Sequence, residues 1–244
     1  MENKAGKSVR EMAKKRHRIT NIILIGSLVV IIVLVLIIDN GKVLGLGGGV
    51  ILSLFILISI LPDLLSGLIK NREKLERRSN RGASAEEIVG DLVDNLIGDF
   101  IVIHDISCPY GNIDHVVIGK NSGVFLLETK AHGGKVRILS DSLLINDKVP
   151  EKDFIAQTLR NTYWLQDEIK KVVGKKIWIT PIIVFTNAFV PFGKPIKGVN
   201  ILNKRYLSDF LHNKILSETD LSLLWNSRNE IFHSIKNQKF GERN

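Results

Sequence analysis

The stretch NIDHVVIGKNSGVFLLETK, residues 112–130, decides the fold of this chain. Apolar residues alternate with other residues over positions 113–119 and 123–130, and the turn sequence KNSG joins the two runs, which predicts two neighbouring strands. Side chains of a strand alternate between its faces, so Glu128 and Lys130 are expected side by side at the end of the second strand. Asp114 on the first strand joins them if the two strands pair. Charged residues would then gather where a buried sheet usually carries valine or isoleucine.

The flanking sequence predicts helices and strands in alternation. Ser84 is a candidate N-cap, with Glu87 as its capping-box partner, for a helix over residues 85–98. Further expected elements are a strand over 100–107, two weak strands near 135–139 and 143–145 after a break at Gly133-Gly134, a helix over 152–173, strands over 176–187 and 199–202, and helices over 204–215 and 219–236. This order, α-β-β-β-α-β with additions, predicts an α/β sandwich around one mixed sheet.

Two apolar runs precede this region. Residues 19–38 carry no charge and reach the length of about 20 residues that a helix needs to cross a bilayer core. A second run, residues 44–61, follows a short polar link, so the pair predicts an N-terminal transmembrane helical hairpin. A cleavable signal peptide is the alternative for the first run. Its apolar region is longer than the roughly 7–15 residues of the apolar core of a signal peptide, and no A-x-A-like site precedes Asp39.

Basic residues indicate the orientation of this hairpin. Seven Lys and Arg residues precede residue 19 and six lie within residues 70–81, whereas the link between the runs holds only Lys42. By the positive-inside rule, the N-terminus and everything after Arg81 are expected in the cytoplasm, in a multi-pass protein of the cell (inner or plasma) membrane. The single cysteine, Cys108, fits a reducing compartment and excludes an intrachain disulfide.

The net charge of +9 does not by itself indicate a nucleic-acid partner. Residues 1–81 hold 14 Lys and Arg against 6 Asp and Glu, whereas residues 82–244 hold 20 against 19 and are almost neutral. The excess therefore lies at the membrane flanks, where anionic lipid head groups attract basic residues. Membrane lipids are the partner that this distribution predicts.

Asp114, Glu128 and Lys130 have the chemistry of metal-assisted phosphodiester hydrolysis. Two carboxylates can bind Mg²⁺ (or Mn²⁺), which takes oxygen ligands and keeps several waters. The metal ion lowers the pKa of a bound water and polarises a phosphoryl oxygen, while a nearby lysine orients the water or stabilises charge on the phosphate. The alternative is a solvated surface pair, because Glu-x-Lys alone occurs by chance in many proteins.

A longer sequence pattern favours the catalytic interpretation over the solvated surface pair. The residues GNIDHVVIGKNSGVFLLETKAHGGKV, with Glu86 in the preceding helix and Gln157 in the following one, resemble the nuclease-related domain (NERD) of the PD-(D/E)xK restriction-endonuclease-like superfamily. The resemblance covers about residues 83–210 and implies a restriction-endonuclease-like αβββαβ sandwich around a mixed sheet. It also implies that Asp114 and Glu128 bind metal, that Lys130 is the catalytic lysine, and that Gln157 and Glu86 complete the site.

The resemblance leaves two points open. Ile113 stands where the superfamily name has proline, although NERD sequences commonly have isoleucine there. Glu87 could replace Glu86, because one sequence does not fix the register of this helix, but the expected capping role of Glu87 favours Glu86. The expected organisation is a basic N-terminus (1–18), two membrane helices (19–61), a charged linker or helix extension (62–82), the nuclease-like domain (83–212) and a helical extension (213–244).

A zinc site is a weaker alternative. The residues His104, Cys108, His115 and His132 lie close in sequence, but neither C-x-x-C nor H-x₃₋₅-H spacing is present. His115 is expected to point away from Asp114, into the sheet.

Two functions are therefore carried forward. The first is a membrane-anchored, Mg²⁺-dependent nuclease that hydrolyses DNA or RNA. The second is a catalytically inactive membrane-tethered module that binds nucleic acid or a protein, since a fold does not imply a function. The sequence singles out neither a protein partner nor a homo-oligomer.

Overall fold

A computed structural model describes residues 25–26, 48–139, 141–191, 193, 195–213 and 216–236, and it describes no side chains for residues 48–69. The chain divides into two compact units. One is Ser8–Asn80, and the other is Arg81–Asn244 together with Met1–Lys7.

The first described long element is the helix α2, Gly48–Asp94. It is continuous through residues 62–82, where glutamate and arginine side chains pair one turn apart: Glu73 with Arg77 at 2.9 Å and Glu76 with Arg72 at 3.8 Å. Such pairs and the straight-chain residues around them favour helix. The predicted helix start at Ser84 is therefore wrong, because Ser84 lies inside α2 and caps no helix.

The predicted membrane hairpin falls largely outside the described residues. Of the first run, residues 19–38, only Ile25 and Gly26 are described, and of the second, 44–61, only the backbone from Gly48 onward. Across the described part of the chain, no helix is both long enough and apolar enough to span a bilayer.

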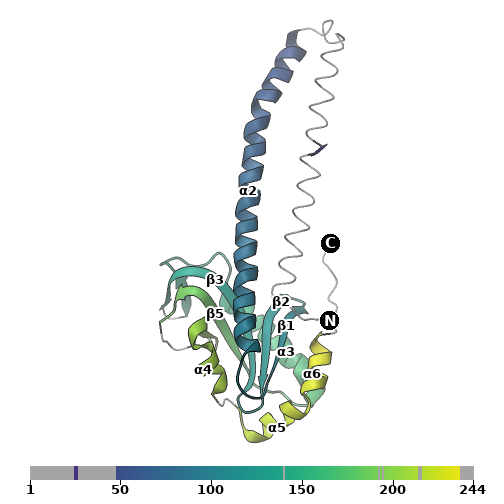
Figure 1. Ribbon diagram of the computed structural model, residues 1–244, viewed down its shortest axis with the longest axis vertical. Coiled ribbons are helices and arrows are strands. Elements are labelled where there is room, and N and C mark those ends of the chain that lie inside the picture. The colour runs from purple at the N-terminus through teal and green to yellow at the C-terminus, as the bar shows by residue number, and fades with distance from the viewer. Residues whose placement is uncertain are drawn as a thin grey trace. The chain divides into compact units, whose positions relative to one another are not determined.

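A single six-stranded sheet forms the centre of the unit that contains Arg81–Asn244 (Figure 1). Its strands are β1 (Phe100–Cys108), β2 (Gly111–Gly119), β3 (Gly123–Leu139), β4 (Ser142–Ile145), β5 (Ile179–Phe189) and β6 (Asn200–Asn203). The order is β1-β2-β3-β5-β6, with β4 on the outer part of β3. Strands β1, β2 and β3 are antiparallel, whereas β5 and β6 run parallel to β3. The predicted α/β fold with a mixed sheet is confirmed.

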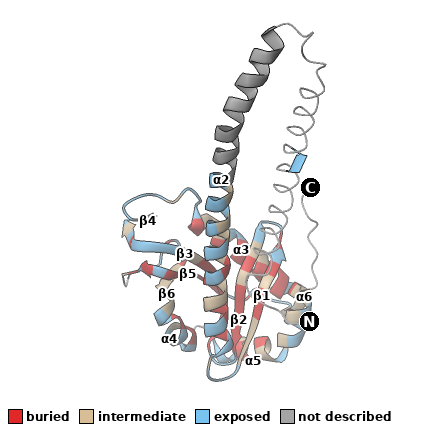
Figure 2. Ribbon diagram, turned by 45° about the horizontal axis from the view of Figure 1, so that its top comes forward, coloured by how far each residue is buried: buried red, intermediate tan, exposed pale blue. Residues whose placement is uncertain are grey.

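Helices cover both faces of this sheet. On one face, residues of α3 (Phe154–Val173), α5 (Glu218–Asn226) and α6 (Arg228–Lys236) share a buried cluster with β1, β2 and β3. On the other face, Val89 and Val93 of α2 and Leu207 and Leu211 of α4 (Leu207–His212) pack against β2, β3 and β5. Buried residues accordingly concentrate in the central strands (Figure 2).

Two predicted helices are shorter than expected. The helix predicted over 204–215 is a 3₁₀ turn, Lys204–Tyr206, followed by α4. The helix predicted over 219–236 is divided into α5 and α6 at Ser227, whose backbone N–H bonds back to Leu223. Leu221 and Leu224 of α5 and Ile231 and Ile235 of α6 are all buried.

The predicted break at Gly133-Gly134 is also wrong, because β3 continues through both glycines to Leu139. The register with β5 shifts between Lys130 and Gly133, and Gly134 has a φ of +95°. Asn146 accepts a hydrogen bond from the backbone N–H of Lys135 at 2.9 Å and fills the space where a Gly134 Cβ would lie. The glycine therefore permits a bulge rather than ending the strand.

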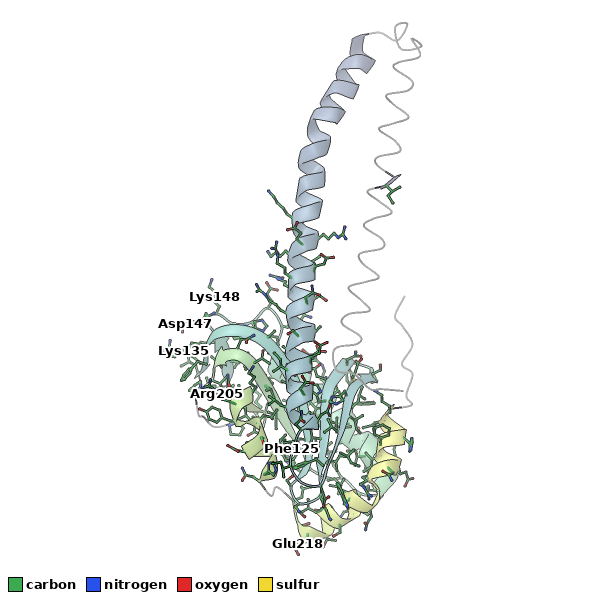
Figure 3. All side chains as sticks on the ribbon, viewed as in Figure 1. Phe125, Lys135, Asp147, Lys148, Arg205 and Glu218 are labelled. Atoms are coloured by element: carbon green, nitrogen blue, oxygen red, sulfur yellow. The ribbon has the colours of Figure 1, made fainter. Side chains whose placement is uncertain are left out.

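Replacing Gly134 with alanine should destabilise the outer end of β3, which carries Lys135 and lies beside Asp147 and Lys148 (Figure 3). The positive φ and the collision with Asn146 predict a loss of about 1–3 kcal/mol in the free energy of unfolding. Denaturant unfolding followed by circular dichroism measures it. Gly82→Ala is the matched control, because its Cβ meets no atom within 4 Å inside α2 and should stabilise by about 0.5–1 kcal/mol. Equal stability of the two variants would contradict the bulge argument.

Candidate active site

Asp114 lies where the ladder between β2 and β3 ends. The last backbone pair is His115 with Leu127, so the next residues, Asp114 and Glu128, are not paired by their backbones. Instead, the Asp114 Oδ2 atom accepts a hydrogen bond from the backbone N–H of Thr129 at 2.6 Å. The Asp114 side chain thus replaces a backbone hydrogen bond between the two strands and lies beside Glu128.

Glu128 is a buried acidic residue next to Asp114. Its side chain is 4% exposed, and its Oε1 atom accepts hydrogen bonds from Lys130 Nζ at 2.6 Å and from Gln157 Nε2 at 3.0 Å. Its Oε2 atom is buried and has no hydrogen-bond partner among the described residues. A buried carboxylate oxygen without a partner is costly, so this atom is suited to a ligand.

Lys130 is held from two sides. Besides its bond to Glu128, its Nζ atom lies 4.5 Å from the centre of the Phe154 ring, at the first residue of α3. Phe154 and Gln157 are three positions apart and share one face of this helix, whose N-cap Asp153 accepts from the N–H of Ala156 at 2.9 Å. Phe154 was not among the site residues expected from the sequence, although its spacing of three residues from Gln157 on the predicted helix was a usable signal.

Glu86 reaches the site from α2. Burial, followed by the negative charges of Asp105 and Glu128, raises its pKa to about 7, while Lys130 opposes the rise. These charges act on Glu86 only if its carboxyl group lies near them. Glu86 therefore lies near Asp105, Glu128 and Lys130, although the capping argument that favoured it does not hold in a continuous helix.

Asp114 is under the same repulsion. Burial raises its pKa well above the ordinary value, and the charges of Glu128 and then Glu86 raise it further. Lys130 and the N–H of Thr129 act in the opposite direction. Three carboxyl groups in one partly buried place repel each other, and a bound cation would relieve that repulsion.

The donor set fits a hard divalent cation held by few protein ligands. In the part of the chain that the structure describes, no three or more Asp, Glu, His or Cys side chains gather closely enough to hold a metal ion. Mg²⁺ is usually bound by one or two carboxylates and keeps several waters. Asp114 and Glu128, with its unpartnered Oε2 atom, meet that requirement.

The residues considered for zinc have other partners. The Nδ1 atoms of His104 and His115 lie 2.8 Å apart, and the Nε2 atom of His104 lies 2.9 Å from Asp94. The Cys108 thiol donates to Asn161 at 3.5 Å, and the His132 ring lies 5.4 Å from the Phe154 ring.

The comparisons with known proteins give one match. No curated protein and no solved structure matches the chain. The family model of the nuclease-related domain, NERD, matches residues 81–186, a range that contains all five of the expected site residues. The resemblance stated from the sequence is thereby confirmed. Residues 81–186 of this chain are a nuclease-related domain, consistent with the PD-(D/E)xK-like superfamily.

Proposed function

We propose that this protein is a divalent-cation-dependent nuclease that hydrolyses phosphodiester bonds of DNA or RNA. The observation that carries the proposal is the buried, unpartnered Oε2 atom of Glu128, next to Asp114 and to the ammonium group of Lys130. A module that only binds a partner has no need of a buried carboxylate oxygen without a hydrogen bond. The nuclease-related domain supports a nuclease-like function in general terms.

In this mechanism Asp114 and Glu128 would hold Mg²⁺ or Mn²⁺. The bound ion would supply an acidic water and neutralise charge on the phosphate. Thr129 orients Asp114 through its backbone N–H, and Gln157 orients Glu128 through its side-chain amide. Both hydrogen bonds keep the ligand oxygens in fixed directions.

Lys130 and Glu86 have separate roles. The Lys130 ammonium group, held between Glu128 and the Phe154 ring, can donate to a phosphate oxygen and stabilise the charge that develops there. Glu86, whose pKa is about 7, is partly protonated near neutral pH and can therefore give or accept a proton.

The proposal extends to the fold and the location. The order α2, β1, β2, β3, α3, β5 follows the αβββαβ core of restriction-endonuclease-like proteins, with β4 as an addition. The apolar runs at 19–38 and 44–61 support a membrane anchor with the nuclease-related domain on the cytoplasmic side.

The test is cleavage by the purified full chain, in detergent, of plasmid DNA, linear DNA and RNA with Mg²⁺, Mn²⁺ or EDTA. Lys130→Met should lower the rate by at least about 100-fold, because the charge at the phosphate is lost. Lys120→Met is the matched control. It removes an exposed lysine paired with Asp99 at 2.8 Å and should leave the rate unchanged.

Lys130→Met also leaves Glu128 buried without its cation, so folding of each variant is checked by circular dichroism. Cation-dependent cleavage that persists in a folded Lys130→Met protein would overturn the proposed role of the lysine. Cation binding without any cleavage by the unaltered chain would favour the inactive binding module instead.

A further inference from the structure

Two short segments of β1 and β2 mirror each other. Residues 103–106 read IHDI and residues 113–116 read IDHV. Their antiparallel pairing places isoleucine opposite valine, histidine opposite histidine and isoleucine opposite isoleucine. Asp105 therefore stands opposite Asp114, at the one position of this stretch that forms no backbone pair.

The alternation of side chains between the two faces is interrupted at this position on both strands, an irregularity that is here called a double bulge. Ile103 and Ile106 are three residues apart, yet both lie in the buried cluster beneath α3. Ile113 and Val116 show the same spacing in the same cluster. In a regular strand, residues three apart point to opposite faces, so each strand contains one extra residue. These extra residues are Asp105 and Asp114.

The conformation of Asp105 carries a cost that its contacts must offset. Its φ is +51°, in the left-handed region that residues other than glycine adopt rarely. Its Oδ1 atom accepts a hydrogen bond from Asn112 Nδ2 at 2.9 Å. After burial, the negative charge of Asp105 is the next largest cause of the raised pKa of Glu86. Asp105 therefore lies on the side of the site where Glu86 enters.

The last described residue of α6 holds this bulge. The Lys236 Nζ atom donates to the backbone carbonyl of His104 at 2.6 Å and lies 3.3 Å from that of Asp105. Hydrogen bonds from a charged donor are stronger than neutral ones, and both carbonyls belong to the bulged segment. On β2, the Asp114 side chain accepts a hydrogen bond from the backbone N–H of Thr129, so a contact from a neighbouring element supports each half of the double bulge.

We propose that Asp105 and Lys236 are positioning residues of the site: Lys236 fixes the β1 bulge, and the bulge presents the Asp105 carboxylate beside Glu86. This inference rests on the proposed function for its role in cleavage, but not for its geometry. Asp105 adds negative charge that draws a cation toward Asp114 and Glu128 without binding it. Through Lys236, the geometry of the site depends on the packing of α6.

Asp105→Asn tests the carboxylate, because asparagine keeps an oxygen for Asn112 and removes the charge. In cleavage assays of the full chain, the Mg²⁺ concentration for half-maximal rate should rise by about 10-fold, whereas kcat at saturating Mg²⁺ should change by less than about 3-fold. Without divalent cations, the variant should melt at a higher temperature than the unaltered chain, since repulsion with Glu86 is relieved. A melting temperature at or below that of the unaltered chain would overturn the placement of Asp105.

Lys236→Met and Lys236→Arg test the positioning. Met should speed amide hydrogen exchange at residues 104–106 and lower kcat by about 10-fold with little change in KM for DNA. Lys236→Arg can still donate to both carbonyls and should therefore restore slow amide hydrogen exchange and the original kcat. Lys175→Met, which removes an exposed lysine paired with Asp220, is the control and should change neither.

These measurements distinguish a failure of the proposed function from a failure of the inference about Asp105 and Lys236. If the unaltered chain cleaves nothing, the proposed function fails, and the melting temperature of Asp105→Asn and the exchange rates of the Lys236 variants still decide the inference. The role of Lys236 is overturned if amide hydrogen exchange at residues 104–106 is unchanged in Lys236→Met. It is also overturned if Lys236→Arg does not restore the cleavage rate that Lys236→Met loses. A lower Mg²⁺ requirement in Lys236→Met with normal kcat overturns it too, because that result reflects only the lost positive charge.

Discussion

Asp114→Asn is expected to abolish cation-dependent cleavage and, at the same time, to stabilise the metal-free protein. The loss of cleavage, at least about 100-fold, follows from the loss of an anionic metal ligand. The gain in stability follows because the neutral side chain no longer repels Glu128 and Glu86, while its oxygen still accepts from Thr129. A gain on the order of 1–2 kcal/mol corresponds to roughly 2–8 °C in melting temperature for a domain of this size.

Cleavage and thermal melting of the same preparations, at pH 8 in EDTA for the melting, measure both effects. Asp99→Asn is the matched control, because Asp99 forms an exposed ion pair with Lys120 and should change stability by less than about 1 kcal/mol and cleavage not at all. A destabilised Asp114→Asn protein would contradict the repulsion that the structure shows. Normal cleavage by a stable variant would contradict the role of Asp114 as a ligand.

The second large effect is a dependence on pH that a divalent cation reverses. The pKa of Glu86 is raised from 4.5 to about 7 by folding. Its contribution to stability is therefore fully present below the unfolded value and is lost as the pH rises through about 7. Relative to Glu86→Gln, the metal-free protein should lose up to about 3 kcal/mol between pH 4 and pH 8. Mg²⁺ should stabilise more at pH 8 than at pH 5, because it replaces the protons of the site.

Comparing the unaltered chain with Glu86→Gln cancels a second pH dependence of stability, which has the opposite sign. Burial lowers the pKa of His115 to about 3, so its contribution to stability is lost as the pH falls from about 6.5 toward 3, and this happens in both proteins. Glu87→Gln is the matched control at the neighbouring helix position and decides which of the two glutamates belongs to the site. Thermal melting of the unaltered chain and of both variants from pH 4 to pH 8, with and without Mg²⁺, measures these differences in stability. Parallel curves for Glu86→Gln and the unaltered chain would contradict the placement of Glu86.

Local periodicity was enough to predict much of the architecture. The two-residue repeat placed Glu128 and Lys130 on one face of a strand, and their 2.6 Å contact on β3 agrees with that placement. The long helix predicted over 152–173 is α3, and the mixed sheet is present. These features depend on side chains within one element, which a single stretch of sequence contains.

Boundaries and breaks were predicted less well, because competing local signals have similar strength. Ser84 with Glu87 is a reasonable helix start, but ion pairs along residues 72–77 favour continuing the helix. The glycines at 133 and 134 resemble a strand end, but Asn146 on the neighbouring turn binds the backbone there and lets β3 continue.

The sequence by itself determined the class of the fold, the acid, acid, lysine group on two adjacent strands and the match of residues 81–186 to the nuclease-related domain. The resemblance already named Gln157 and Glu86 as site residues, and only the tertiary structure decided the contacts around the group: Gln157 on Glu128, Phe154 against Lys130 and Asp105 opposite Asp114. The physical reason is that these contacts join residues from different elements, whose relative register depends on the packing of the whole sheet. The polar pair at 104–105, within a mostly apolar strand, was a local sign of the double bulge.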